Sequence, residues 1–137
     1  MKAITITTEV RKPMQKVWEY FTIPKHITKW NFASSDWACP HATNDLKPGG
    51  KFSWRMEAKD GSMGFDYSGT YTEIKHHDLI KYTLDDGREV SVKFEESGGI
   101  VLVTETFEPE NQNDLEMQRQ GWQAILDNFK MHAEKVV

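Results

Sequence analysis

Hydrophobic and polar residues change their spacing along this chain, and the change predicts a long helix at its end. Between residues 110 and 137, apolar side chains recur with the period of an amphipathic helix, at Trp122, Ile125, Leu126, Phe129, Ala133 and Val136. Asn113 suits the N-cap position, and Glu116 would complete a capping box three residues later. Because no second long helix precedes it, we expect this helix to lie across a sheet.

Six segments before the helix alternate apolar and polar residues, which is the pattern of half-buried strands. These segments are residues 2–10, 52–57, 63–75, 79–84, 88–97 and 100–108. Short turns join the last five, so neighbouring strands are expected to pair antiparallel, since a parallel crossover needs about a dozen residues. The apolar phase slips between Tyr71 and Ile74, which predicts a β-bulge near residues 69–73.

Two short helices are predicted between the first two strands. Pro13 begins the first at a position where its missing N–H is harmless, and Pro24 ends it. The second covers residues 25–30, and residues 31–45 are expected to form an irregular loop. Residues 1–137 are therefore predicted to form one α+β domain, with a six-stranded antiparallel sheet and a long C-terminal helix across it.

Composition narrows the functional classes. The net charge is −4 and no run of basic residues occurs, which argues against a nucleic-acid surface. Cys39 is the only cysteine, so no intramolecular disulfide can form. The N-terminal residues lack the continuous apolar run of a signal peptide or a membrane span, and a cytoplasmic location is the expectation.

The sequence contains no recognisable catalytic or metal-binding motif. The five histidines have no HExxH or similar ligand spacing, and the segment Cys39-Pro40-His41 lacks a second ligand pair. A GxSxG elbow and a glycine-rich phosphate loop are also missing, which argues against hydrolase and kinase activity. We therefore expect no metal, no cofactor and no catalysis.

Several short motifs occur along the chain in a characteristic order. They are Pro13 through Val17-Trp18 to Phe21-Thr22 and Pro24, then Trp30, then Pro48-Gly49-Gly50 before Phe52, then Gly69-x-Tyr71-x-Glu73-Ile74, and Gly121-Trp122 with Leu126. This order resembles the activator of heat-shock protein 90 ATPase homologue-like (AHSA) family, within the START-like (SRPBCC) helix-grip superfamily. The resemblance implies a curved antiparallel sheet that grips the C-terminal helix and leaves an apolar cavity between them.

Gly121 interrupts the apolar pattern of the predicted helix, where glycine costs about 1 kcal/mol relative to alanine. Two explanations stay open. The sheet backbone can pass close to the helix at this point, or the missing side chain can leave space between the helix and the sheet. The second explanation would place Gly121 at the cavity that the family resemblance implies.

Aromatic residues make up 12% of the chain, and they can fill a core or line a pocket. Core filling alone accounts for Trp18, Trp54 and Trp122 as well as a pocket does. The pocket hypothesis places ten residues around the cavity, with tyrosine hydroxyls and one amide as its polar groups. They are Trp30, Phe32, Trp37, Trp54, Phe65, Tyr67, Tyr71, Gln118, Gly121 and Trp122.

Whether the cavity could support catalysis depends on where four charged strand residues point. They are Arg55, Glu57, Asp66 and Glu105. In polyketide cyclases and aromatases, which are related helix-grip proteins, polar groups in the cavity direct reactions of a bound aromatic molecule. We expect the four residues to face water, Glu105 being the most ambiguous because its strand phase contains Val103 and Phe107.

A small apolar or aromatic molecule, of lipid, sterol or flavonoid type, is the predicted ligand of the cavity. A protein-interaction role is the alternative, because the family name implies activation of a chaperone ATPase. The eukaryotic activators carry an additional N-terminal domain that contributes to chaperone binding. A cyclase-like enzyme is the third hypothesis, and it requires polar residues that face inward.

Overall fold

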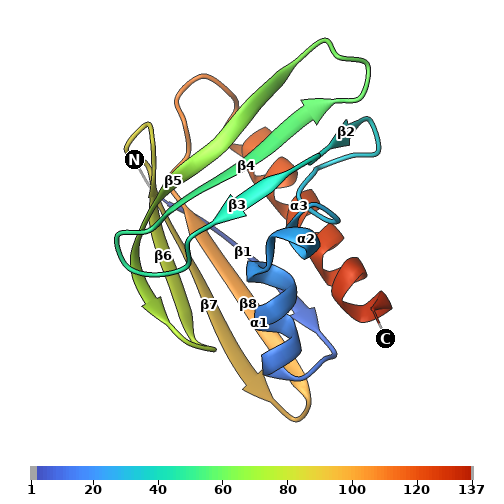
Figure 1. The fold of residues 1–137 in the computed structure, drawn as a ribbon, viewed down its shortest axis with the longest axis vertical. Coiled ribbons are helices and arrows are strands. Elements are labelled where there is room, and N and C mark those ends of the chain that lie inside the picture. Colours follow the sequence, from blue (N-terminus) through green and yellow to red (C-terminus); the bar gives the residue numbers. More distant parts are fainter. Residues whose placement is uncertain (1–2, 137) are drawn as a thin grey trace.

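A strongly curved antiparallel sheet holds a long helix across its concave face in the computed structural model, which describes residues 3–136 (Figure 1). The strands are β1 (Ile4–Val10), β2 (Trp37–Ala38), β3 (Ala42–Asn44), β4 (Lys51–Ala58), β5 (Gly64–Lys75), β6 (Leu79–Leu84), β7 (Glu89–Ser97) and β8 (Ile100–Phe107). The helices are α1 (Met14–Thr22), α2 (Pro24–Ile27) and α3 (Leu115–Lys135). The strands follow the order β1-β8-β7-β6-β5-β4-β2, and β3 also pairs with β4. The predicted β-bulge is confirmed by a register shift between Tyr71 and Glu73.

The described part of the sheet has eight strands instead of the predicted six, because residues 31–45 are not a continuous irregular loop. β2 and β3 pair antiparallel with β4, which places Trp37 opposite Ala58 and Ala42 opposite Trp54. With 2 and 3 residues, these strands are too short to display a period of two in the sequence. Their pairing covers the edge that β4 would otherwise present to solvent.

The long helix begins at Leu115, later than the predicted residue 110. Asp114 is the N-cap, since its side chain accepts a hydrogen bond from the backbone N–H of Glu116 at 3.0 Å. The predicted cap at Asn113 is therefore wrong. Aspartate and asparagine are about equally good N-caps, so the sequence pattern alone does not distinguish two adjacent candidates.

The core lies between α3 and the inner face of the sheet. Leu126 and Phe129 of α3 are buried there, and Val101 and Val103 of β8 face them from the sheet side of the core. Leu102, between the two valines, is half-buried on the opposite face.

The helices within residues 3–136 all lack the combination of length and apolarity that a bilayer crossing requires.

Polar side chains of α3 cover the free edge of β1. The Gln123 amide donates a hydrogen bond to the carbonyl of Thr7 at 3.1 Å, and the Lys130 ammonium donates to the carbonyl of Glu9. An edge strand with unpaired carbonyls is a site where another chain can add a strand. The long helix therefore both fills the core and satisfies part of the sheet edge.

Gly121 of α3 faces open space. A Cβ atom built at this position would meet no other atom within 4 Å, so the explanation by close backbone contact is wrong. Gly69 of β5 is the contrasting case, because a Cβ there would lie 2.4 Å from the carbonyl oxygen of Thr83. The helix glycine therefore has no packing reason in the described chain, and a gap between helix and sheet at Gly121 stays a prediction.

The substitution Gly121→Ala should stabilise the fold by about 0.5 to 1 kcal/mol, because it removes the helix penalty of glycine without creating a clash. The measurement is the free energy of unfolding from urea titration. Gly69→Ala is the matched control and should destabilise, since its methyl group has no room. A loss of stability in Gly121→Ala would contradict the open surroundings of this glycine.

Candidate functional site

A small cavity of about 40 Å³ lies where the N-terminal half of α3 meets the sheet. From the sheet it is lined by Trp54, Met56, Tyr67, Tyr82 and Glu105. From the helices and the segment after α2 it is lined by Phe21, Trp30, Asn31, Trp122 and Ile125. Residues far apart in the sequence therefore meet at one partly open cavity, whose walls are mostly aromatic.

Local geometry explains why these side chains converge. Trp54 and Met56 are two residues apart on β4 and so project from the same face of the strand. Tyr67 lies directly opposite Trp54 in the β4–β5 register. Trp122 and Ile125 are three residues apart on α3 and therefore share one side of the helix.

The aromatic wall is packed ring against ring. The ring centroids of Trp30 and Trp54 are 6.1 Å apart, and those of Trp54 and Tyr67 are 5.6 Å apart. Trp122 closes the wall on the helix side, 6.0 Å from Tyr67 and stacked on Phe107 with centroids 3.9 Å apart. Such contacts add to the stability that burial supplies, so the wall is a well-ordered surface.

Glu105 is the charged residue that breaks the apolar inner face of β8. Its neighbours across the sheet are Ile6 on β1 and Val92 on β7, and it is only 8% exposed. Burial without a compensating cation or hydrogen bond raises the pKa of the Glu105 carboxyl to about 8. The carboxyl is therefore mainly protonated and neutral at pH 7.

Two tyrosine hydroxyls share the enclosure with this carboxyl. The hydroxyl oxygens of Tyr67 and Tyr82 are 2.7 Å apart, so one donates a hydrogen bond to the other. Burial raises the pKa of both hydroxyls, which therefore stay protonated at neutral pH. The hydroxyl that accepts the shared bond keeps its own proton for a further partner.

Two tryptophans of the wall, Trp30 and Trp54, differ in the partners of their indole nitrogens. The indole N–H of Trp30 donates to the carbonyl of Tyr20 at 2.9 Å, so its orientation is fixed by the protein. The indole nitrogen of Trp54 is buried and has no hydrogen-bond partner within residues 3–136. A buried donor without a partner costs about 1–3 kcal/mol, so a partner from outside the chain would relieve that cost.

Four of the ten residues predicted to line the pocket lie at this cavity, namely Trp30, Trp54, Tyr67 and Trp122. Their role in ligand binding stays a prediction. Trp37 and Phe65 contact each other, with centroids 6.1 Å apart, and are both outside the lining.

The remaining predicted residues have other surroundings. Phe32 is half-buried and its carbonyl accepts a hydrogen bond from the Asn128 amide. Tyr71 packs on Phe52 and donates its hydroxyl proton to Asn44.

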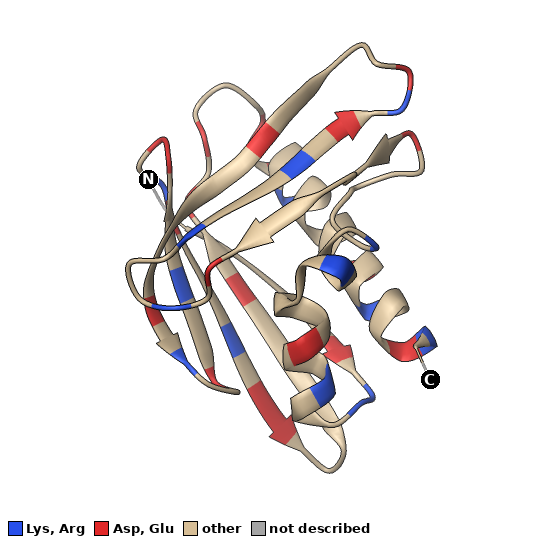
Figure 2. Ribbon diagram, viewed as in Figure 1, with Lys and Arg blue, Asp and Glu red and all other residues tan. Residues whose placement is uncertain are grey.

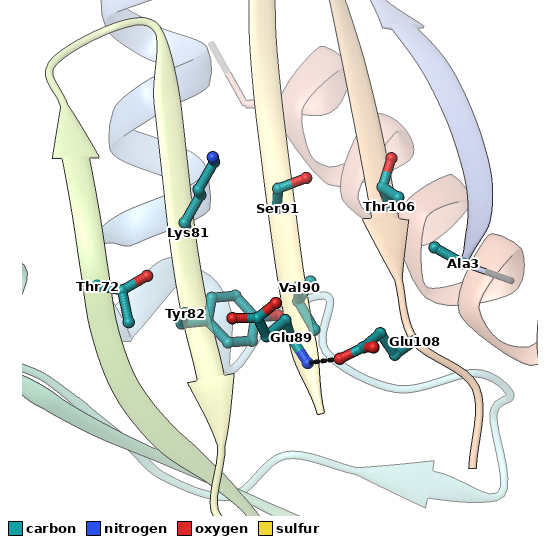
Figure 3. Close-up of a pocket in the computed structure, with 9 residues that line it drawn as sticks. All are labelled: Ala3, Thr72, Lys81, Tyr82, Glu89, Val90, Ser91, Thr106 and Glu108. Atoms are coloured by element: carbon teal, nitrogen blue, oxygen red, sulfur yellow. Dashed lines mark hydrogen bonds between the residues drawn. The ribbon is translucent and has the colours of Figure 1, made fainter. Parts of the chain in front are cut away.

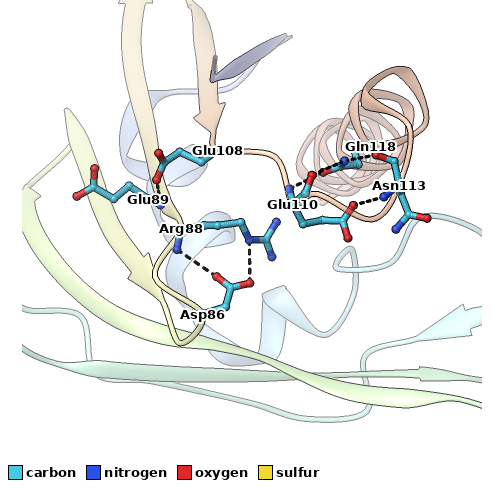
Figure 4. Close-up of polar contacts among 7 residues, drawn as sticks. All are labelled: Asp86, Arg88, Glu89, Glu108, Glu110, Asn113 and Gln118. Carbon is cyan, nitrogen blue, oxygen red and sulfur yellow. Dashed lines mark hydrogen bonds and ion pairs between the residues drawn. The ribbon is translucent and has the colours of Figure 1, made fainter. Parts of the chain in front are cut away.

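Gln118 fastens the loop before α3. Its amide donates to the carbonyls of Glu110 and Asn113 and accepts from the Glu110 N–H (Figure 4). Neither Gln118 nor Gly121 belongs to the cavity lining.

Sequence reasoning missed six lining residues, which are Phe21, Asn31, Met56, Tyr82, Glu105 and Ile125. For Glu105 the signal was present, because it shares its strand phase with Val103 and Phe107, and the expectation that it faces water is wrong. The other three charged strand residues, Arg55, Glu57 and Asp66, form ion pairs with one another at partly exposed positions, as expected for side chains that meet water.

A larger hollow of about 340 Å³ lies over the other face of the sheet. Figure 3 shows side chains from neighbouring strands lining it, among them Thr72, Lys81 and Ser91, with the Glu89 N–H bonded to the Glu108 carboxylate at 2.6 Å. Acidic and basic residues are interspersed along the ribbon instead of gathering by sign (Figure 2). None of the residues that line this hollow has a buried side-chain group without a partner, whereas Trp54 of the inner cavity does, so the inner cavity is the better candidate.

Metal-ligating residues do not gather within residues 3–136, where no group of three or more His, Cys, Asp or Glu side chains has a suitable arrangement. Cys39 is buried and its pKa is raised by burial, which lowers its reactivity at neutral pH. The chemistry of the candidate site therefore rests on the carboxyl, hydroxyl and indole groups of the inner cavity.

The chain is similar to one protein family and to several solved structures. The model of the family described as Activator of Hsp90 ATPase homolog 1-like protein matches residues 11–134. The solution structure of an AHSA1-like protein from Aeromonas hydrophila is 41% identical, with a TM-score of 0.87 over 96% of this chain and 92% of that chain. A protein from Cytophaga hutchinsonii is 48% identical, with a TM-score of 0.84 over 96% and 91%.

A protein from Chromobacterium violaceum shares the fold at 19% identity, with a TM-score of 0.87 over 99% of this chain and 100% of that chain. The comparison with curated proteins found no match. The predicted helix-grip fold is confirmed by these structural likenesses.

Glu105→Gln should change stability in a pH-dependent way. The folded-state pKa of Glu105 is raised, so its contribution to stability is fully present below pH 4.5 and is lost as the pH rises to 8. Glutamine does not ionise, so the free energy of unfolding of the variant, relative to that of the wild type, should increase across this range by up to about 1.4 kcal/mol per pH unit.

Urea titrations of both proteins at several pH values measure this difference. Glu95→Gln, at an exposed position of β7, is the matched control and should show no such trend. A difference between Glu105→Gln and the wild type that does not vary with pH would contradict the burial of an unpaired carboxyl.

Proposed function

The chain belongs to the family of Activator of Hsp90 ATPase homolog 1-like proteins, and we propose that it binds a small, mostly apolar or aromatic molecule in the cavity between α3 and the sheet. The ligand lies against the aromatic wall and brings a polar group to Glu105, Trp54 and the tyrosine pair. The protein releases the molecule unchanged, so its role is to sequester or sense the ligand.

The observation that carries this proposal is that Glu105 and Trp54, two polar groups without a hydrogen-bond partner in the described chain, lie in the lining of one mostly aromatic cavity. A cavity that only filled the core would be more stable with a leucine in place of Glu105, because an unpaired buried carboxyl costs free energy. Trp54 adds an indole N–H without a partner within residues 3–136, in the same lining. A ligand that supplies the missing hydrogen bonds explains both groups together.

The volume of the cavity sets the size of the ligand. About 40 Å³ is room for two or three water molecules, since one water needs roughly 10–15 Å³ by this measure. Drug-sized ligands occupy pockets of roughly 300–1,000 Å³. A cavity that binds benzene measures about 150 Å³, so a compact ring requires the lining side chains to move apart, and a sterol or flavonoid requires α3 to move away from the β4–β5 hairpin.

A protein-interaction role is the second candidate, and exposed apolar side chains favour it. Met63 is 65% exposed and Phe65 is 47% exposed, and Trp37 lies beside Phe65. Leu115 and Met117 are exposed in the first turn of α3. Apolar residues that adjoin one another at the surface, as Trp37 and Phe65 do, are typical of surfaces that another protein covers.

A cavity-filling variant tests the ligand-binding function. Toluene, cyclohexanone and methylenecyclohexane are compact ring compounds that should raise the stability of the wild type, by about 2.7 kcal/mol at a hundredfold excess over Kd. In NMR spectra they should shift the indole signals of Trp54 and Trp122 more than that of Trp37. Ile125→Phe should remove these effects, because the larger side chain occupies the cavity.

Met131→Phe is the matched control, since Met131 is 60% exposed on the same helix, and it should bind like the wild type. Unfolding curves establish that both variants are folded. If no ring compound shifts the Trp54 and Trp122 signals, or if binding persists in a folded Ile125→Phe variant, the ligand-binding function is wrong and the interaction surface becomes the leading candidate.

A further inference from the structure

We propose that the ligand presents an uncharged acceptor oxygen, such as a ketone carbonyl, which is held by the side chains of Glu105 and Trp54. This inference rests on the proposed ligand-binding function and specifies the chemical class of the ligand. It follows from the hydrogen-bond donors that the cavity leaves without a partner.

Hydrogen-bond donors at the cavity lack partners. The Trp54 indole can only donate, and its N–H has no partner within residues 3–136. The pair formed by Tyr67 and Tyr82 has two hydroxyl protons, of which their shared bond uses one. The Asn31 amide, also in the lining, has its nitrogen 3.8 Å from the sulfur of Cys39. These groups call for an oxygen that accepts hydrogen bonds.

Glu105 adds a further donor, because its carboxyl is in the acid form at neutral pH. No lysine, arginine or histidine is among the residues that line the cavity. Ile6 and Val92 flank Glu105 on the neighbouring strands, and Trp122 faces the cavity from α3. Burial raises the pKa of this carboxyl, and nothing in the lining opposes that effect.

The other titratable groups near the cavity do not change this balance. Tyr67 and Tyr82 stay neutral, because burial raises the pKa of both hydroxyls. Arg88, which acts on Tyr67 from the β6–β7 turn, is paired with Asp86, with the Arg88 Nε atom 2.8 Å from the Asp86 carboxylate (Figure 4). The cavity itself is therefore uncharged at neutral pH.

An uncharged acceptor suits this arrangement better than an ion does. An ammonium group would need an ionised Glu105 and would leave the indole N–H and the free tyrosine proton unpaired. A carboxylate would enter an apolar enclosure that offers no cation. A ketone oxygen has two lone pairs and can accept from Trp54 and from the acid form of Glu105 at the same time.

Three ring compounds of matched shape test the inference by NMR titration of the Trp54 indole signal. Cyclohexanone carries the acceptor oxygen, methylenecyclohexane replaces that oxygen by CH₂, and cyclohexylammonium carries a positive charge. Cyclohexanone should bind wild-type protein at least about tenfold more tightly than either of the other two, since each of its hydrogen bonds pairs a group that would otherwise be buried alone.

Two variants assign the contacts. Glu105→Gln keeps a donor that cannot ionise, so the affinity for cyclohexanone should not change with pH. In the wild type that affinity should fall as the pH rises through 8 and Glu105 loses its proton. Trp54→Phe should still bind methylenecyclohexane, observed through the Trp122 indole signal, and should lose most of its preference for the ketone. Glu95→Gln, the exposed control, should respond to pH like the wild type.

The outcomes separate this inference from the function on which it rests. Equal affinity for cyclohexanone and methylenecyclohexane in the wild type would overturn the acceptor-oxygen inference and leave ligand binding in place. Tightest binding of cyclohexylammonium would overturn it in favour of a cation. If none of the three compounds binds, the inference and the ligand-binding function are both wrong.

Discussion

The packing of one straight helix across a strongly curved sheet is the constraint on which the rest of the structure depends. The C-terminal half of α3 buries Phe129 and Ala133 in the core, while its N-terminal half presents Trp122 and Ile125 to a cavity. Near the end of α3, the Nε2 atom of His132 lies 3.0 Å from the Nδ1 atom of His26, so α2 contacts this half of the helix. A curved surface cannot follow a straight helix over its whole length, so the cavity forms where the two diverge.

Glu105 lowers the stability of this arrangement and at the same time supplies the cavity with a functional group. A carboxyl among Ile6, Val92 and Val103 lowers stability at neutral pH relative to an apolar side chain of similar size. The same burial gives the cavity a neutral acid that can donate a hydrogen bond. An inward acid is also what a cyclase-like reaction would need, so the binding function and that enzymatic hypothesis depend on one residue.

Much of the fold could be predicted because its signals are long and periodic. The apolar stripe of α3 and the phase slip near Tyr71 both correspond to observed features. The strands β2 and β3 could not be predicted, because their pairing with β4 and not their own pattern stabilises them. The cavity was predicted less completely, since its lining depends on which rings meet across the core, and sequence spacing does not contain that information. Glu105 is the instructive case: its strand phase pointed inward, and only the general preference of glutamate for water argued otherwise.

Because the cavity is small, its selectivity depends more on hydrogen bonding than on shape. A compact apolar ring has many analogues of nearly equal volume, and one methylene group more or less changes affinity by only about 1–3 kcal/mol. A site that leaves buried donors unpaired rejects an analogue without an acceptor far more strongly, because the indole N–H of Trp54 and the acid of Glu105 then stay desolvated and unbonded. The ligand must therefore supply the hydrogen bonds that these groups lack, which favours a molecule with an oxygen beside them and an apolar part against the aromatic wall.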